Sequence, residues 1–536
     1  MIIELLLFVI TAFFAYAVYH QKRLVNRFKE YDIGIIPGVP LFGNFFKSSF
    51  SKRHFFYDLD EVYRAFPKDR YAVIVENTTP IVLIRDPELI KQITVKDFDH
   101  FTDHKPFFSE QHDPLLGGSL LMLKGDKWKD MRTTLSPAFT GSKMRQMVPF
   151  IDEISKNIVE YLKAEIKDTS DGKISQVIDV NDLIRRYTND VILSVAFGLQ
   201  VNSLKDKNNE MYLSGQRLSK FTVWQRISMF LILSFPNLTT KFGMSLFPKQ
   251  VTNLFMDVID RTMKHRDQNK VHRPDMIQLL MEAAKGTLKT NNNQELTKED
   301  DVGFATTEEV LVKDQSTVRQ WTQSELTAQA FIFYFAGFES SASALVMTIH
   351  ELALNKDIQN KLYAEAKKFQ DEKKEMSLEL VQELKYLDMV INETLRKWSP
   401  ALMMDRECIK PYVLPPARPS GKPYTVEKGE VVYNSVNSLH MDEKYYPDPE
   451  RYDPERFSDE NKHKIHPFTF MPFGMGPRNC IGSRFALLEL KILMYYLVLN
   501  FEIKKCEKTT DPVRLQTYDF NIKAQDGTWV QFKIRA

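Results

Sequence analysis

Hydrophobic residues recur at helical spacing through most of this chain. From about residue 125 onward, apolar side chains return every three to four positions, which predicts amphipathic and buried helices. The clearest such segments are residues 151–166, 276–285 and 324–354. Because this helical pattern runs through most of the chain, it predicts a mainly α-helical domain.

Shorter stretches follow the pattern of strands. Residues 71–75 and 80–85 are β-rich runs around a short polar turn, which predicts a hairpin. Residues 520–534 alternate between apolar and polar side chains and predict a second hairpin at the C-terminus. The whole pattern therefore predicts a mainly α fold (α+β) with small β-sheets.

The N-terminal segment is apolar on all sides. Residues 5–19 carry no charge and, with Ile2 and Ile3, are about long enough for a tilted membrane helix. Basic residues follow this run, and Glu4 is the only charge before it, which favours a cytosolic domain. We expect a membrane anchor at residues 1–20, a basic and Pro/Gly-rich linker at residues 21–45 and one large domain at residues 46–536. A cleaved signal peptide is the alternative, because residues 15–17 resemble a cleavage site.

Composition narrows the function classes. The formal net charge of +2 over 536 residues excludes a strongly basic nucleic-acid binder, so we expect no nucleic-acid partner. The three cysteines are an odd number without metal-ligand spacing, which favours a reducing compartment. Residues 286–323 are polar without strong periodicity and predict a long, mobile surface loop.

A glycine-rich loop near the C-terminus carries the strongest chemical signal. Cys480 lies between glycines that let the backbone approach a flat cofactor closely. A helix-forming stretch follows, so we expect the dipole of a helix N-terminus to favour the thiolate of Cys480. A lone thiolate in such a loop suits an axial ligand of haem iron, and a buried structural cysteine is the alternative.

This loop resembles the haem-ligand signature of the cytochrome P450 monooxygenases, Phe-x-x-Gly-x-Arg-x-Cys-x-Gly. The matching residues are Phe473, Gly476, Arg478, Cys480 and Gly482. The resemblance covers essentially the whole chain and implies haem b (iron protoporphyrin IX) as cofactor. It also implies the cytochrome P450 fold, a large helical domain with small β-sheets behind an N-terminal anchor helix. The chain looks similar to insect microsomal members related to the vertebrate drug-metabolising group, which implies the endoplasmic reticulum membrane.

A polar interruption of the long apolar segment resembles a second motif of the family. Residues 336–341 match Ala/Gly-Gly-x-Asp/Glu-Thr-Thr/Ser, which implies that Glu339 and Ser340 are catalytic and deliver protons. Ser340 stands where Thr is usual, so the hydroxyl is kept but its orientation is freer. A core helix with a small-residue packing notch is the alternative.

Several residues are implied to contact the cofactor. Trp128 and Arg132 lie one helical turn apart, so both can reach an anionic haem propionate from one face. By position in the family, the remaining cofactor-binding residues are Arg406, Phe473, Arg478 and His104.

Other matches to the family imply structure and pocket. Glu393 and Arg396 match Glu-x-x-Arg and, with Arg456, imply a buried structural triad that locks the cysteine loop. Candidate walls of a substrate pocket are Phe107, Phe108, Leu121, Phe335, Ala336, Ala401 and Leu402, and each could equally belong to the core.

Two surfaces are implied by position in the family. The apolar residues 226–247, broken by Pro236, would form the roof of a substrate channel and rest on the membrane; a buried core helix is the alternative. A basic group would dock an acidic flavoprotein by electrostatic steering. Its residues are Lys127, Lys129, Lys143 and Arg145.

The resemblance implies insertion of one oxygen atom from dioxygen into lipophilic substrates, such as plant toxins or insecticides. Electrons would come from NADPH through a separate NADPH–cytochrome reductase, with cytochrome b5 as a further partner. Three alternatives stay open: a hydroxylase of a hormone, fatty acid or pheromone, a reductase-independent enzyme that rearranges peroxides, and a non-enzymatic membrane protein that binds haem or lipophiles.

Overall fold

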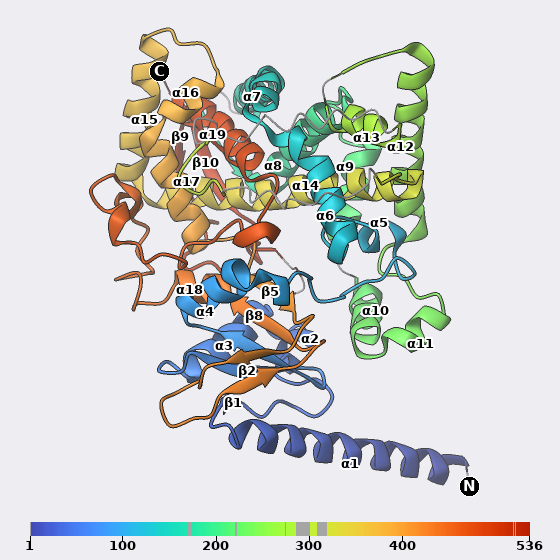
Figure 1. The fold of residues 1–536 in the computed structure, drawn as a ribbon. Coiled ribbons are helices and arrows are strands. Elements are labelled where there is room, and N and C mark those ends of the chain that lie inside the picture. The colour runs from blue at the N-terminus through green and yellow to red at the C-terminus, as the bar shows by residue number, and fades with distance from the viewer. Residues whose placement is uncertain are drawn as a thin grey trace.

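The described part of the protein is mainly helical with three sheets, and the pattern of its sequence predicts such a fold (Figure 1). The computed structural model describes residues 2–169, 174–219, 222–273, 275–285, 301–307, 319–517, 519 and 521–535. Most of the loop predicted at residues 286–323 lies outside these residues.

Helix α14 (Gln323–Leu354) runs through the middle of the helical part (Figure 1). Thr322 caps it, and Glu325 returns a hydrogen bond to the cap in a capping box. Among the described residues, α14 is the one helix long and apolar enough to cross a membrane, but 67% of its most apolar window is buried inside the protein. We therefore describe it as the central core helix.

Four long helices pack beside α14 or beside each other. They are α7 (Gly141–Thr169), α8 (Val180–Ile192), α17 (Lys385–Lys397) and α19 (Ser483–Asn500). Further helices are α2 (Phe46–Ser49), α3 (Phe56–Ala65), α4 (Pro87–Lys91), α5 (Pro114–Gly117), α6 (Gly125–Leu135), α9 (Glu210–Ser219), α12 (Lys249–Asn269), α13 (Met276–Ala284), α15 (Lys356–Asp371), α16 (Leu378–Glu383) and α18 (Val436–His440).

The largest sheet has five strands in the order β1-β2-β3-β8-β5. Its strands are β1 (Gly34–Ile35), β2 (Tyr71–Glu76), β3 (Thr79–Ile84), β5 (Met403–Glu407) and β8 (Val431–Ser435). The predicted hairpin of β2 and β3 is confirmed, with Tyr71 opposite Ile84. A separate two-stranded sheet joins β6 (Tyr412–Leu414) and β7 (Tyr424–Val426).

The hairpin predicted at the C-terminus is wrong in its partner. Strand β10 (Trp529–Ile534) lies between β4 (Ser175–Asp179) and β9 (Phe501–Lys504), antiparallel to both. The local pairing upstream of it is an isolated bridge between Leu515 and Ala524. An alternating pattern identifies a half-buried strand, but it does not identify the strand beside it.

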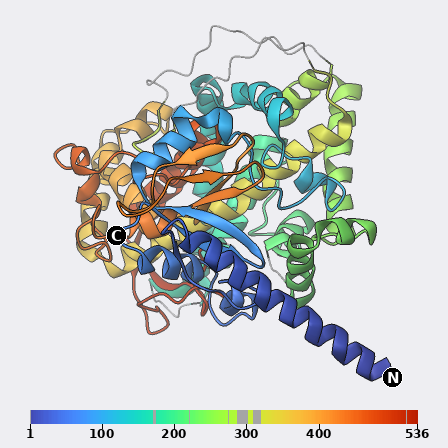
Figure 2. The same cartoon turned by 60° about the horizontal axis from the view of Figure 1, so that its bottom comes forward.

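Helix α1 (Ile2–Lys29) projects from the sheet end of the molecule (Figures 1 and 2). Its first half exposes Leu5 and Phe8, whereas Leu24 and Phe28 near its end are buried against the sheet. The helix therefore continues past residue 20 into the domain. Helices α10 (Val223–Ser234) and α11 (Pro236–Lys241) lie at the same end of the molecule (Figures 1 and 2).

Candidate functional site

Cys480 lies in a tight loop that ends where α19 begins. Its backbone N–H donates to the carbonyl of Phe473 at 2.7 Å. Gly474 and Gly476 have φ values of 77° and 70°, a region that favours glycine. A β-carbon at Gly476 would lie 1.8 Å from the carbonyl oxygen of Thr94, so only glycine fits where the loop meets this backbone.

The Cys480 side chain is exposed, although its neighbours Arg478 and Asn479 are buried. The protein around the loop raises the pKa of the Cys480 thiol, and this desolvation outweighs the opposing effects of the Gly482 backbone and of Arg132. The preference for thiolate expected from the start of α19 stays a prediction, because burial outweighs the favourable backbone contribution at Gly482. A bound metal cation would reverse the balance, because a coordinating thiol loses its proton.

Buried arginines surround this loop. Arg132 on α6 donates to the carbonyl and to the side-chain oxygen of Asn479, at 2.8 and 2.7 Å. The guanidinium of Arg478 lies 3.9 Å from the centre of the Trp128 ring and donates to the carbonyl of Thr102. The structure thus brings the cysteine loop onto α6, the helix that carries both Trp128 and Arg132.

Three buried arginines and two buried aspartates lie around this loop, and the carboxylate of Asp103 is 3.5 Å from Arg478. Burial lowers the pKa of Arg406 to about 10, and the Nε atom of Arg406 has no hydrogen-bond partner among the described residues. The pKa of Arg478 is also lowered, by burial first and then by the charge of Arg406. Asp405 supplies one anion. Burial alone would raise the pKa of Asp405, but His104, whose Nδ1 atom lies 3.0 Å away, lowers it to about 2.

A haem fits this set of side chains. Its two propionates would accept hydrogen bonds from guanidinium groups such as that of Arg406, because a guanidinium matches carboxylate geometry. An exposed sulfur beside them is a suitable axial ligand for its iron. The unpartnered Nε atom of Arg406 is the observation that tests this fit most directly.

The acid and the hydroxyl predicted on α14 have separate partners. The carboxylate of Glu339 is buried and lies 2.5 Å from Arg185 of α8, and it accepts a hydrogen bond from Ser219 of α9 at 3.0 Å. The hydroxyl of Ser340 instead donates to the carbonyl of Ala336 at 2.6 Å. Ala336 and Ser340 are accessible on a helix that is otherwise largely buried.

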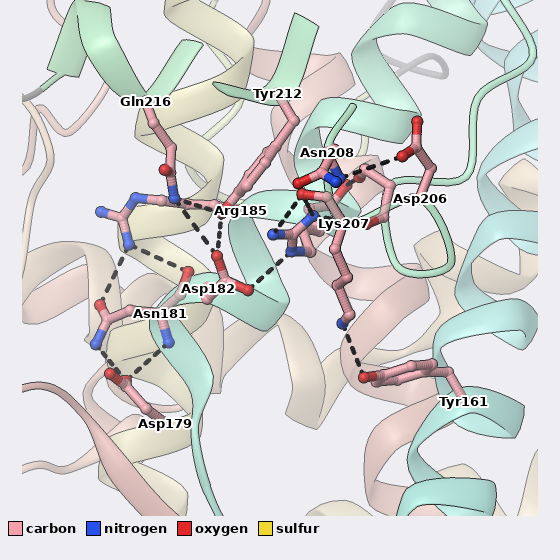
Figure 3. A network of polar contacts seen from close by, with 12 residues as sticks. Tyr161, Asp179, Asn181, Asp182, Arg185, Asp206, Lys207, Asn208, Tyr212 and Gln216 are labelled. Atoms are coloured by element: carbon pink, nitrogen blue, oxygen red, sulfur yellow. Dashed lines mark hydrogen bonds and ion pairs between the residues drawn. The ribbon is translucent and has the colours of Figure 1, made fainter. Parts of the chain in front are cut away.

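Arg185 is held in place by its own helix. Its guanidinium donates to the backbone and side chain of Asn181, and the amide of Asn181 donates to Asp179 at 2.7 Å (Figure 3). Figure 3 also shows Asp182, one turn from Arg185, where it accepts from the hydroxyl of Tyr212 on α9. The end of α8 is therefore a polar junction between α14 and α9. Sequence reasoning missed Arg185, because no motif marks it.

Glu393 and Arg396 form a fully buried ion pair. Two guanidinium nitrogens of Arg396 donate to the two carboxylate oxygens, at 2.7 and 2.9 Å. The Nε atom of Arg456 lies 3.5 Å from the same carboxylate. Arg396 also donates to the carbonyls of His440 and Pro449, so the pair joins α17 to the chain that precedes the cysteine loop.

His440 connects this ion pair to the cysteine loop. Its Nε2 atom accepts the backbone N–H of Met471 at 3.0 Å, and its Nδ1 atom lies 3.1 Å from the carbonyl of Arg396. Burial, and then the charge of Arg396, lowers the pKa of His440 to about 3, so the ring is neutral. Sequence reasoning missed this residue, since a single histidine outside any motif gives no signal.

The candidate pocket residues lie in two different surroundings. Phe335 stacks on Phe331 with ring centres 6.1 Å apart. Leu402 packs in a small cluster with Met347 and so contributes to the core there. The remaining candidates are Phe107, Phe108 and Ala401, which are half-buried, and Leu121 and Ala336, which are exposed.

Most of the predicted basic group is paired with acids. Lys127 lies 3.1 and 2.9 Å from Glu110 and Glu325. The partner of Lys129 is Asp126, and that of Arg145 is Glu379 on α16. The surface near α6 and the start of α7 is therefore a mixed ionic surface.

The cysteine loop and the buried arginines beside it form one site, in which a thiol and several guanidinium groups could hold a haem. The family model for cytochrome P450 matches residues 34–307 and 305–528. The probable cytochrome P450 9f2 of Drosophila melanogaster is 40% identical over 528 residues, which is 96% of this chain and 97% of the relative. Cytochromes P450 9e2 and 6k1 of Blattella germanica are 38% and 34% identical, over 95% and 92% of this chain and 94% and 90% of their own.

The chain belongs to the cytochrome P450 family. It is therefore an oxidoreductase of the haem-dependent monooxygenase class, similar to insect members of that family.

Proposed function

We propose that this protein inserts one oxygen atom from dioxygen into lipophilic substrates, including xenobiotics such as plant toxins or insecticides. Electrons come from NADPH through a separate reductase. The observation that carries this proposal is Cys480 in its glycine-rich loop beside the buried Arg132, Arg406 and Arg478, with the Nε atom of Arg406 unpartnered among the described residues.

Each residue of the site has a proposed role in holding the cofactor. Cys480 ligates the iron, while the carbonyl of Phe473 fixes the Cys480 backbone. When bound, haem supplies the activation of dioxygen and its transfer to the substrate. The residues that orient the propionates are Trp128, Arg132, Arg406, Arg478 and His104. The buried triad of Glu393, Arg396 and Arg456 keeps the loop in this position.

Glu339 and Ser340 handle protons. Ser340 holds a proton on its hydroxyl, at the accessible turn that begins with Ala336. Glu339 supplies or removes protons when its carboxylate leaves Arg185, because the buried ion pair otherwise holds it turned toward α8. The loss of the threonine methyl at residue 340 leaves the hydroxyl freer than in the family motif.

The exposed apolar residues at the sheet end support attachment to the endoplasmic reticulum membrane. Residues 1–20 form the anchor, with residues 2–20 in α1, and the rest of the chain lies in the cytosol. Trp224 on α10 and Phe242 after α11 are 68% and 75% exposed, which suits a second contact with lipid and an entrance for lipophilic substrates. The apolar side chains proposed for the pocket favour such substrates. Cytochrome b5 is a further proposed electron donor.

Reconstitution tests this function. The full chain is placed in vesicles with an NADPH-dependent reductase, and products of a panel of lipophilic substrates are collected under isotopically labelled dioxygen. We expect one labelled oxygen atom per product and no product without NADPH. Product formation from peroxides without NADPH would identify a rearranging enzyme, and substrate binding without any product would identify a binding protein.

A further inference from the structure

A short described segment, residues 301–307, lies against α17 and α19. The backbone N–H of Phe304 donates to the carboxylate of Asp388 on α17 at 3.1 Å. The ammonium group of Lys491 on α19 donates to the carbonyl of Val302 and lies 2.8 Å from Asp388. The sequence predicts a mobile loop here, but these residues are docked through hydrogen bonds and an ion pair.

The 301–307 segment reaches the cysteine loop. The hydroxyl of Thr307 lies 3.0 Å from that of Ser483 and 3.4 Å from the carbonyl oxygen of Cys480. The ring of Phe304 stacks on Phe470, with centres 5.8 Å apart. The segment therefore covers part of the surface next to the candidate haem ligand.

Gly303 makes this docking specific. A β-carbon at Gly303 would lie 1.9 Å from a carboxylate oxygen of Asp388 and 3.0 Å from the ammonium nitrogen of Lys491. Only a residue without a side chain lets the backbone come this close to the two charged groups. An alanine at this position would push the 301–307 segment away from Asp388 and Lys491.

The segment also places an acid on a cation of α19. Asp301 lies 2.9 Å from Arg484, whose side chain is only 7% exposed beneath it. The backbone carbonyl of Asp301 accepts a hydrogen bond from Gln382 on α16. Because Glu379 of the same helix binds Arg145, the segment lies next to the predicted docking surface for an acidic protein.

We propose that the 301–307 segment belongs to the docking surface of an acidic, electron-donating protein and controls its access to the Cys480 loop. In the free enzyme Asp301 forms an ion pair with Arg484. On docking, a carboxylate of the partner replaces Asp301 in this ion pair. Complementary charges at the edge of a protein–protein interface set the rate and the salt dependence of association. This inference rests on the proposed function, because it requires an electron donor.

Two variants of the full-length protein in vesicles test the inference. Asp301→Asn removes the charge with little change in shape, and Gly303→Ala unseats the segment. The matched control is Asp257→Asn, since Asp257 pairs with Arg261 on the surface of α12. We measure the affinity for the purified reductase, hydrogen exchange at the Phe304 amide, and turnover driven by reductase or by added peroxide.

Both variants should bind the reductase about two- to five-fold more tightly, the range expected for release of one ion pair whose acid, Asp301, is 33% exposed. Asp301→Asn should also increase the dependence of binding on salt, and Gly303→Ala should speed exchange at Phe304. Turnover driven by peroxide should stay at the wild-type rate. Unchanged or weaker reductase binding by Asp301→Asn would overturn the inference.

Failure of the proposed function has a different signature. In that case the wild-type protein itself would lack the absorption band of thiolate-ligated haem with carbon monoxide. A normal band combined with unchanged reductase binding in Asp301→Asn would overturn only the role of the 301–307 segment.

Discussion

The guanidinium of Arg185 lies 2.5 Å from the carboxylate of Glu339, and both side chains are buried. This pair joins α8 to α14 at the residue proposed to supply protons. A carboxylate held on Arg185 must move before it can exchange a proton with Ser340. Structure and proton delivery therefore depend on the same interaction and need variants that separate them.

Glu339→Gln should lower NADPH-driven product formation by about 100-fold, the lower end of the usual contribution of general acid–base catalysis. It should also lower the free energy of unfolding by about 3–5 kcal/mol, because Arg185 stays buried without its anion. The double variant Arg185→Met with Glu339→Gln should regain stability but not turnover. Wild-type turnover in Glu339→Gln would contradict the role of Glu339.

Ser340→Thr should improve coupling, measured as product formed per NADPH consumed. The added methyl group restricts the side-chain rotamer and holds the hydroxyl that now donates to Ala336 in one orientation. Ser340→Ala should reduce coupling and release more hydrogen peroxide. Equal coupling in all three proteins would show that this hydroxyl takes no part in proton delivery.

The buried ion pair of Glu393 and Arg396 should be the more fragile part of the triad. Arg396→Met leaves a fully buried carboxylate without its main partner, at a cost of about 3–5 kcal/mol in the free energy of unfolding. Arg456→Met should cost less, because Arg456 is 13% exposed and lies 3.5 Å away. Urea unfolding and haem content per protein measure both effects, and equal losses in the two variants would contradict this ranking.

Glu489 on α19 should make stability depend on pH. Burial raises the pKa of Glu489 from 4.5 to about 8, opposed by the nearby Ser341, and neither carboxylate oxygen has a hydrogen-bond partner among the described residues. Between these values the native state keeps a proton that the unfolded chain has released, so stability falls as pH rises, by about 1.4 kcal/mol per pH unit.

Glu489→Gln removes this titration and keeps a neutral side chain of the same shape. The difference in melting temperature between this variant and the wild type should therefore increase, in favour of the variant, from about pH 5 to about pH 8. Above that range the difference should stay constant. A constant difference across this range would mean that Glu489 is ionised in the native state.

Trp224 should report contact with lipid. It is 68% exposed on α10, and we expect brominated lipids to quench the fluorescence of the full-length protein. Trp224→Phe should abolish most of that quenching, whereas Trp529→Phe on β10 should not. Equal quenching in Trp224→Phe and the wild type would place α10 away from the membrane.

The sequence predicts those parts of the protein that depend on local spacing. Cys480 and its glycines are neighbours in the chain, as are Glu393 and Arg396, so their chemistry can be read from a motif. The hairpin of β2 and β3 has the same local origin.

Contacts between distant segments could not be predicted in this way. Arg185 meets Glu339 across two helices, and His440 meets Met471 only after the chain has folded. The position of Gly303 against Asp388 has no counterpart in periodicity, so polar composition alone predicts a mobile loop. Burial likewise raises the pKa of Cys480, where a helix dipole considered alone predicts the opposite.

The most direct test of the account is the difference spectrum of the reduced, carbon-monoxide-bound protein in membranes. We expect the strongly red-shifted Soret band of thiolate-ligated haem in the wild type, in Cys408→Ala and in Cys506→Ser, and its loss in Cys480→His. A folded wild-type protein without this band, or a Cys480→His variant that retains it, would contradict the assignment of Cys480 as the haem ligand.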